Sequence, residues 1–327
     1  MQGFDSSFKD FPGYILDITK EIWENRGIAT LHDYCSEDIV VRMPGSVSTG
    51  NQNVIAATMA TLAEFPDRTL LGEDVIWSGS PEEGMLSSHR ILSTATHLGE
   101  GAYGKPTGKP LVYRILADCH AINNKINDEW LIRDQGAILR QMGWEPKAFA
   151  ADLIEREGGI DNCVKPLTPE TDIEGPYLGT GNDNRWGEAY AGNLRSIMAA
   201  DLRVIEHNYD RAVQTEYPGG ATGHSYASVD HFWMGLRAAF PNAQFTIHHQ
   251  IGRDDPLMPP RASIRWSLWG KHEGYGAFGP PTGAMVYVMG ISQAEYGALT
   301  NSEAKIRREY TLFDEAAIWK QILLQTK

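Results

Sequence analysis

The chain has 327 residues, more than one hydrophobic core usually supports, so two domains are the natural expectation. Hydrophobic residues make up 42% of it, which excludes a disordered or fibrous protein. Acidic residues outnumber basic ones 42 to 29, and the formal charge of −13 would repel nucleic acid and anionic lipid surfaces.

Neither a membrane span nor a leader is expected from the sequence. No segment approaches the roughly 18 apolar residues that a membrane helix needs, and the first residues show no basic patch followed by an apolar run. We therefore expect a cytoplasmic protein with no membrane and no nucleic acid partner. Cys35, Cys119 and Cys163 are widely spaced and form no CxxC pair, so neither disulfides nor a zinc site are expected.

The first half of the chain predicts helices followed by strands. Apolar residues between Tyr14 and Trp23 recur at three- and four-residue steps, which is typical of an amphipathic helix. A second helix is expected over 51–64, ended by Pro66. Four strand-like stretches come next, the last followed by a short helix: 68–78, 84–98, 111–122 and 126–134. This order indicates an α+β fold rather than alternating βαβ units.

The second half of the chain repeats the first. Residues 96–108 read THLGEGAYGKPTG and residues 271–283 read KHEGYGAFGPPTG, so both share HxGxGA, an aromatic residue and GxPTG. Phe-Pro-Asp at 65–67 likewise matches Phe-Pro-Asn at 240–242. Such a repeat predicts two copies of one domain. A stretch rich in Gly, Pro, Asn and Asp lies between them, which predicts a first domain, a linker and a second domain over 1–154, 155–185 and 186–327.

The fourth strand predicts an apolar face that ends in a carboxylate. Ile126, Asp128, Trp130, Ile132 and Asp134 alternate along that face. If the preceding turn has three residues, 123–125, the strand before it adds four residues to the same face: Arg114, Leu116, Asp118 and His120. We expect this face to look into the core of the domain, so that His120 and Asp134 line one cavity.

The other face of the preceding strand is also apolar: Tyr113, Ile115, Ala117, Cys119 and Ala121. An apolar outer face needs a cover. We therefore expect the two copies to pack sheet to sheet as an internal pseudo-dimer, which leaves a further homo-oligomer open.

Three segments resemble the SnoaL-like polyketide cyclases: THLGEGAYGKPTGK, the strand ending in His120, and INDEWLIRDQGAILRQMG. The resemblance implies two tandem cone-shaped domains of the nuclear transport factor 2 superfold, each a curved antiparallel sheet packed on helices around an apolar pocket, with no cofactor. It also implies that Asp134 is a general base and that His120 points into the same pocket. Asp118 stands where the family often has glutamine, and like charges at close range would raise one pKa.

Asp134 and His120 each have two interpretations. A general base that works near neutral pH is a carboxylate withdrawn from bulk water, and the Trp130 and Ile132 side chains would shield Asp134. Alternatively, Asp134 caps the helix that begins at Gln135. His120 would hydrogen-bond an enolate oxygen, or it is a buried histidine satisfied by a neighbouring backbone group.

Further pocket candidates follow from the same pattern. In the first copy they are Asp118, Trp130, Arg114, Leu116, Trp77 and Trp23. In the second copy they are Asp314, Gln293, Glu295 and Tyr310. Since Gln293 and Glu295 replace Asp118 and His120, the first pocket should be the better catalyst. No metal is expected, because adjacent histidines such as those at 248 and 249 point to opposite faces of a strand.

Two functions from different classes remain open. The first is a cofactor-independent enzyme that removes a proton next to the carbonyl group of a small hydrophobic molecule, with aldol-type cyclase, isomerase, dehydratase and hydrolase as the reactions to separate. The second is a non-catalytic protein that holds a small molecule in the same pockets. His97 and His272, which share one loop position in both copies, are expected to serve the fold.

Overall fold

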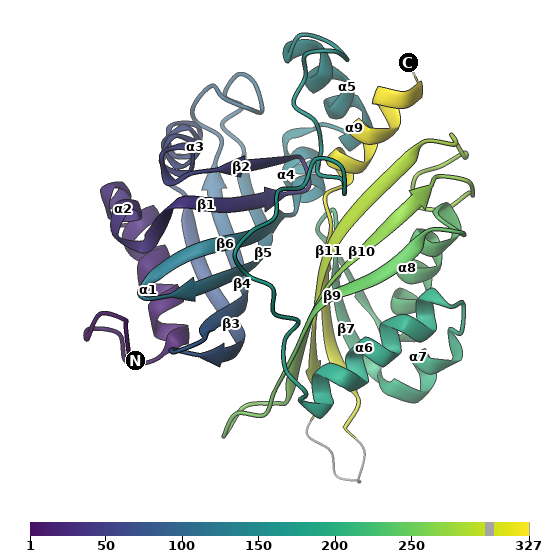
Figure 1. Ribbon diagram of the computed structural model, residues 1–327. Coiled ribbons are helices and arrows are strands. Elements are labelled where there is room, and N and C mark those ends of the chain that lie inside the picture. Colours follow the sequence, from purple (N-terminus) through teal and green to yellow (C-terminus); the bar gives the residue numbers. More distant parts are fainter. Residues whose placement is uncertain (298–303, 327) are drawn as a thin grey trace.

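The computed structural model describes residues 1–297 and 304–326. Within them the chain forms two domains of the same topology, each a six-stranded sheet with helices packed against it (Figure 1). The strand order is β2-β1-β6-β5-β4-β3 in the first sheet and β8-β7-β12-β11-β10-β9 in the second. Neighbouring strands pair antiparallel, except that β1 pairs parallel with β6 and β7 with β12. The expected α+β class and the tandem duplication are confirmed.

The first domain is built in the order α1 (Phe11–Trp23), a 3₁₀ turn (Ile28–Thr30), α2 (Leu31–Tyr34), β1 (Cys35–Met43), β2 (Ser46–Thr49), α3 (Asn51–Glu64), β3 (Thr69–Ser80), β4 (Gly84–Thr96), β5 (Pro110–Ile122), β6 (Lys125–Arg133), α4 (Gln135–Met142) and α5 (Pro146–Arg156). Asp10 begins α1 by accepting a hydrogen bond from Gly13 N at 2.8 Å, a common N-cap arrangement. The buried face of α1 carries Tyr14, Ile18 and Ile22, as the periodicity predicts.

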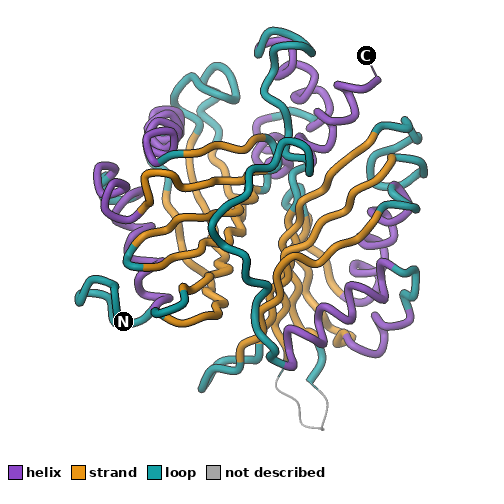
Figure 2. The backbone as a smooth tube through the Cα atoms, in the orientation of Figure 1, coloured by secondary structure: helices purple, strands orange, loops and turns teal. Residues whose placement is uncertain are grey.

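The second domain follows in the same order: α6 (Arg185–Met198), α7 (Arg203–Asn208), β7 (Tyr209–Tyr217), β8 (Ala221–His224), α8 (Ser225–Ala239), β9 (Gln244–Arg253), β10 (Arg261–Lys271), β11 (Met285–Tyr296), β12 (Ile306–Leu312) and α9 (Glu315–Thr326). Residues 157–184 contain neither helix nor strand and cross from one domain to the other (Figure 2). The boundaries 1–154, 155–185 and 186–327 stay a prediction.

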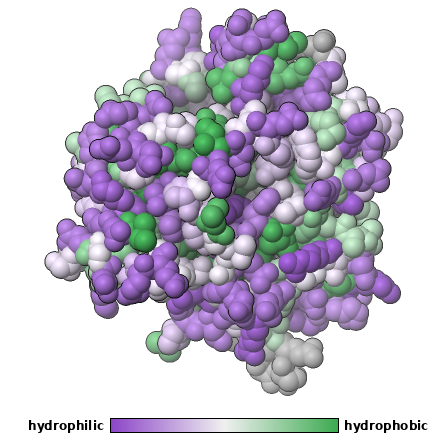
Figure 3. Space-filling model, in the orientation of Figure 1, coloured by the Kyte–Doolittle hydropathy of each residue, from purple (hydrophilic) through white to green (hydrophobic). Residues whose placement is uncertain are grey.

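The surface and the helix lengths bear on membrane contact. On the face drawn in Figure 3, hydrophobic side chains form separate small groups among hydrophilic ones. In the part of the chain that the structure describes, no helix is long and apolar enough to cross a membrane.

Two local features differ from the sequence expectation. The strands β1 and β2 were not expected, because β1 carries Ser36, Glu37 and Asp38 at its solvent-facing start and so lacks a clear alternation. The turn between β5 and β6 has two residues, not three. Its residues Asn123 and Asn124 have φ of 51° and 65°, the left-handed values that a tight two-residue hairpin requires.

The faces of β5 and β6 are the reverse of those expected. Ala117 and Cys119 pack with the α1 residues Ile15 and Ile18 inside the first domain. The positions expected to face inwards lie between the two sheets instead. There they form a cluster with the second domain: Leu116, Ile132, Leu167, Met289, Ile291 and Leu312. The sheets therefore pack on one another through the face that the sequence pattern places towards the core.

A bulge in β6 explains part of this reversal. Ala121 pairs with Ile126 and His120 pairs with Asp128, so Asn127 is an extra residue and the alternation shifts at this point. Ile126 consequently lies on the helix side, although Trp130 and Ile132 face the other domain and Asp128 accepts from Tyr177 N in the segment that crosses between the domains. Because both faces of β5 are buried, hydrophobicity alone could not tell which of them looks towards the helices.

Contacts between the sheets are reciprocal. Arg90 Nη1 donates to Gln293 Oε1 at 2.9 Å, and the equivalent Arg265 Nη1 donates to Asp118 Oδ2 at 2.9 Å. The Ser88 hydroxyl lies 2.6 Å from its own equivalent in the second copy. Each arginine also stacks on a ring of the other domain, Arg265 on Trp130 at 3.5 Å and Arg90 on Tyr310 at 3.6 Å. This is the pattern of an isologous two-fold interface.

Candidate functional site

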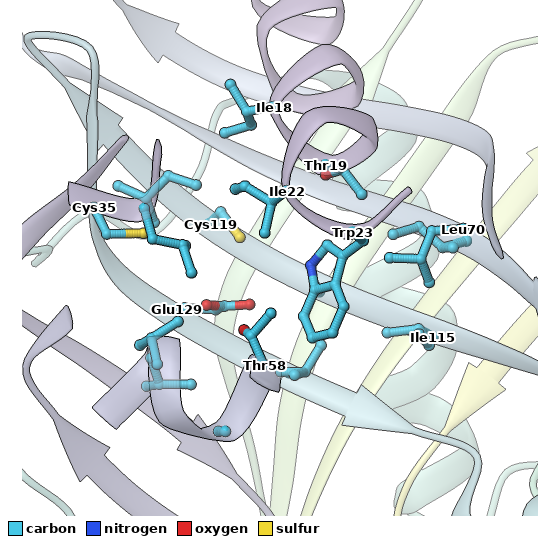
Figure 4. A pocket seen from close by; sticks show the side chains of 18 of the residues that line it. Ile18, Thr19, Ile22, Trp23, Cys35, Thr58, Leu70, Ile115, Cys119 and Glu129 are labelled. Atoms are coloured by element: carbon cyan, nitrogen blue, oxygen red, sulfur yellow. The ribbon is translucent and has the colours of Figure 1, made fainter. Parts of the chain in front are cut away.

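A cavity of about 180 Å³ lies inside the first domain, between the sheet and the helices α1 and α3 (Figure 4). Its wall is mostly apolar and includes Ile18, Ile22, Leu70, Ile91, Ile115 and Leu131. An apolar protein cavity of ~150 Å³ accommodates benzene, so this one has room for a small organic molecule. Side chains from four elements point into the cavity (Figure 4): Trp23 from the end of α1, Thr58 from α3, Cys119 from β5 and Glu129 from β6.

Charged and titratable side chains interrupt the apolar wall. Glu129 and Arg133 come from alternate positions of β6, on the face opposite Trp130 and Ile132. Arg68, just before β3, and His89 on β4 also line the cavity. An apolar pocket with a few convergent polar groups is the usual form of a small-molecule site.

Glu129 is the group in this cavity whose charge changes near neutral pH. Burial raises the pKa of its carboxyl group to about 7, and the nearby Arg133 guanidinium opposes that rise. Burial lowers the pKa of His89 to about 4, so this imidazole is neutral at pH 7. The thiols of Cys35 and Cys119 stay protonated, because burial raises their pKa values, that of Cys35 to about 12.

Arg68 brings a cation to the cavity wall without a counter-ion. The residue is 3% exposed, and burial lowers its pKa to about 10, which leaves it charged at pH 7. Its Nε donates to Ser93 Oγ at 3.3 Å, and its guanidinium stacks on Trp23 at 4.6 Å. Nη1 of Arg68 and Nε of Arg133 are buried and have no hydrogen-bond partner in the described residues. Donors of this kind are costly to leave unpaired.

The two catalytic candidates from the sequence do not share this cavity. Asp134 Oδ1 accepts from Ala137 N at 3.0 Å and from Gly219 N at 2.7 Å, and Oδ2 accepts from Gly220 N at 2.8 Å. The carboxylate thus caps α4 and ties it to the second domain. Asp134 instead lines a second cavity of about 200 Å³ between the two sheets, with Arg114, Leu116 and Tyr310, and His120 does not line it. The expectation that His120 and Asp134 face the core of the first domain and line one cavity there is therefore wrong.

His120 lies between the sheets. Its Nδ1 is 2.6 Å from Asn127 Oδ1, and its ring lies 4.5 Å from that of Tyr177 in the segment that crosses between the domains. This arrangement is closer to the satisfied buried histidine than to a group that faces a substrate. A catalytic role for His120 or Asp134 stays a prediction.

The other candidates of the first copy mostly lie at the same interface. Asp118 pairs with Arg265, while Leu116 and Trp130 pack between the sheets. Arg114 pairs with Glu73 of its own domain and, at 2.9 Å, with Glu216 of the other. Trp77 packs beside Phe11, with the ring centroids 5.9 Å apart. Trp23 is the one of these six that lines the cavity.

Among the candidates of the second copy, Tyr310 lines the cavity between the sheets beside Asp134. Gln293 and Glu295 bind Arg90, and Tyr310 lies beneath its guanidinium. Asp314 caps α9 by accepting from the backbone N–H groups of residues 316 and 317 at 2.8 and 3.0 Å. Burial raises the pKa of Asp314 to about 7.

Glu309 is the equivalent of Glu129, since each lies five residues before the aspartate that ends its strand. Its carboxylate accepts from the hydroxyls of Tyr190, Tyr209 and Tyr217 at 2.8, 2.6 and 2.5 Å, and from Trp233 Nε1 at 3.2 Å. Tyr190, Tyr209 and Trp233 belong to the packed core of the second domain, and Tyr217 is also buried. The same carboxylate that faces a cavity in the first domain is therefore fully engaged in the second.

Larger or apolar residues replace the cavity residues in the second domain. Counting from the repeat motifs, Met43, Thr58, Arg68, His89 and Arg133 correspond to Tyr217, Trp233, Ala243, Ile264 and Phe313. These five replacements belong to the hydrophobic core of the second domain or contact Glu309 within it. The inside of the second cone is thus filled with side chains at the positions that shape the cavity of the first.

Sequence reasoning missed Glu129, Arg133, Arg68 and His89. A signal was present in EWLIRD, where two charged residues alternate on a strand whose other face is apolar. Charges on a buried strand face indicate a ligand site or an ion pair. The two histidines at the shared loop position were assigned correctly, because His97 and His272 each contact a threonine hydroxyl of the PTG motif at 3.1 Å.

Comparison with known proteins finds a family model that matches the first domain. Residues 14–142 match the family model of the SnoaL-like polyketide cyclases. No curated protein matches the chain. Among solved structures, IdmH from Streptomyces antibioticus is 24% identical over 39% of this chain and 96% of its own, with a TM-score of 0.34. A SnoaL-like polyketide cyclase from Agrobacterium tumefaciens is 18% identical over 42% and 98%, with a TM-score of 0.33.

Proposed function

Residues 14–142 belong to the SnoaL-like polyketide cyclase family, and on that premise we propose that the first domain is a cofactor-independent enzyme that removes a proton from a carbon next to a carbonyl group, with Glu129 as the general base. The observation that carries the proposal is a carboxylate with a pKa near 7 that faces an apolar cavity. A base of this pKa has the strength and the ionisation that proton abstraction at neutral pH needs.

The neighbouring groups supply what the developing charge requires. Proton removal leaves an enolate, whose oxygen needs hydrogen-bond donors in a site with little water. Arg133 and Arg68 carry unpaired N–H groups at the cavity wall. The proton passes to Glu129. The enolate carbon then attacks a second carbonyl to close a ring, and the alkoxide that forms takes the proton from Glu129. In an isomerisation a conjugated enolate takes that proton at another carbon instead. Aldol-type cyclisation and isomerisation share the first step.

Deuterium exchange tests the first step without knowledge of the natural substrate. Cyclic β-diketones and aryl ketones that raise the melting temperature of the chain would be incubated with it in D₂O. Proton NMR would then follow the loss of signal at the carbon next to the carbonyl. Exchange that is faster than in buffer supports the proposal. Ligands that bind without any exchange would favour the non-catalytic binding protein.

The exchange rate should rise with pH through about 7 and then level off, because the base works only when it is ionised. Its pKa is raised in the folded protein, so the protonated, inactive form persists well above the usual range of a glutamate. Asp314 provides a control, since its pKa is also about 7 although it caps α9. Asp314→Asn should leave the midpoint of the pH profile in place, and a midpoint that moves in this variant would speak against Glu129.

The variant Asp134→Asn tests whether Asp134 or Glu129 is the general base. Two oxygens of Asp134 accept three backbone N–H groups. Asparagine supplies one acceptor and turns its own NH₂ group towards a donor, so the free energy of unfolding should fall by about 1–3 kcal/mol. The exchange rate at a temperature where the variant is folded should stay within about twofold of the wild type, far from the ~100-fold loss that removal of a general base causes. Loss of exchange without loss of stability would return the catalytic role to Asp134.

A further inference from the structure

We infer that the cavity of the first domain binds an anionic substrate, a small apolar or aromatic carboxylic acid whose carboxylate is held by Arg68 and Arg133. The inference deepens the proposed function, because it names the class of molecule that would be presented to Glu129. The binding claim itself does not depend on turnover, and the two can be tested separately.

The first observation is that Arg68 is an exception among the buried arginines. Five arginines of residues 1–297 and 304–326 are at least nine-tenths buried, and Arg68 is one of them. The other four each pair with a carboxylate: Arg42 with Asp128, Arg90 with Glu295, Arg261 with Asp74 and Arg265 with Asp118. No carboxylate of the described residues lies within 4.0 Å of the Arg68 guanidinium nitrogens. A buried cation without a partner is strongly disfavoured.

The second observation is how Arg68 is held. Trp23 lies beneath the guanidinium at 4.6 Å and Tyr113 lies 6.0 Å away, while Ser93 fixes Nε. These contacts hold the plane of the guanidinium and leave Nη1 without a partner at the cavity wall. A planar guanidinium with free donors matches the geometry of a carboxylate. Arg133 adds a second unpaired donor from β6.

The third observation comes from the second domain, which is an internal comparison. Its cone has the same strand order, yet Ala243 and Phe313 stand in place of the two arginines. Its buried glutamate is retained. The fold therefore forms without either cation, and both are absent from the domain in which core side chains occupy the equivalent positions. This correlation points to a role of Arg68 and Arg133 in binding rather than in folding.

The charge of the cavity favours an anion. At pH 6, the two guanidinium groups are cationic, Glu129 is mostly protonated and His89 is neutral. The Cys35 and Cys119 thiols on β1 and β5 are also uncharged. An incoming carboxylate meets two cations and no anion under these conditions. Above pH 7 the ionised Glu129 would repel it, so affinity for a carboxylate should fall as pH rises.

Isothermal titration calorimetry with 2-naphthoate and 2-naphthamide on the full chain tests this inference. The two probes have nearly the same shape, and one of them is charged. At pH 6 we expect naphthoate to bind about tenfold tighter or more, the gain typical of a hydrogen bond to a charged group. Arg68→Met should remove most of this preference, and Arg68→Lys should keep part of it. Circular dichroism would show whether each variant is folded.

Two controls make the outcome decisive. Arg237→Met changes a guanidinium of the second domain that donates to the carbonyl groups of Phe240 and Ala243, and it should keep the preference. Glu129→Gln should also keep it, while making the affinity for naphthoate independent of pH between 6 and 8.

Equal affinity for both probes, no binding of either at millimolar concentration, or an unchanged preference in folded Arg68→Met would overturn the inference. A chain that exchanges protons on a neutral ketone but shows no preference for naphthoate would leave the proposed enzyme standing and refute the anion site alone.

Discussion

Glu129→Gln should reduce deuterium exchange by about 10²- to 10⁴-fold, the usual contribution of a general base. Glutamine has nearly the same shape and cannot accept the proton. The substitution also removes a carboxylate whose charged form is disfavoured by burial, so the melting temperature should stay the same or rise. The measurement is proton NMR in D₂O on the best ketone ligand, with binding of that ligand checked by calorimetry.

Measuring both deuterium exchange and ligand affinity in Glu129→Gln separates loss of catalysis from loss of binding. A Glu129→Gln variant that binds the ketone with unchanged affinity and has lost exchange assigns the proton transfer to this carboxylate. A variant that exchanges at the wild-type rate would rule Glu129 out as the base, and Asp134→Asn would then be the next variant to measure. Loss of both binding and exchange would be resolved with Glu129→Asp, which keeps the charge and shortens the side chain.

Glu309→Leu should destabilise the chain strongly, whereas the same substitution at Glu129 should not. Leucine at 309 leaves three tyrosine hydroxyls and one indole N–H without their shared acceptor in a packed core. At about 1–3 kcal/mol for each donor left unpaired, and with some donors pairing among themselves, the loss should be ~3 kcal/mol or more. For a domain of this size the melting temperature should fall by roughly 6–12 °C.

Leucine at 129 removes a carboxyl group whose charged form is disfavoured by burial, at a cavity with a mostly apolar wall, so the loss of stability should be smaller than at 309. Thermal unfolding followed by circular dichroism compares the two variants directly. Similar losses in both would mean that Glu129 is as much a part of the packing as Glu309. That result would also remove the reason for treating the second domain as a filled copy of the first.

Much of the architecture is readable from the sequence because it depends on local signals. The helix over 51–64, the four later strands and the tandem repeat follow from periodicity, proline and the shared loop motif, and the structure has them. The sequence also predicts that the first copy is the better catalyst. This stays a prediction, and the residues on which the sequence based it lie at the interface.

The candidate site is harder to predict because it depends on which face of a strand meets the helices. Both faces of β5 are buried, one by helices and one by the other sheet, so the apolar pattern is ambiguous. The extra residue Asn127 then shifts the alternation of β6. Arg68 is brought to Glu129 by the fold, although 61 positions separate them, and no local pattern links the two.

The reciprocal contacts between the sheets join two halves of one chain, and each half can change its amino acids independently of the other. In a pair of identical subunits every amino-acid change occurs twice, so the cavity of one subunit could not be filled with side chains unless that of the other were filled too. Here the two arginines face different partners, a carboxylate at Asp118 and a neutral amide at Gln293, so the halves already differ along their shared boundary. One half is thereby able to gain rigidity from tyrosines and tryptophans while the other keeps its interior empty. The second domain is then a densely packed partner for the first, present at a fixed one-to-one ratio.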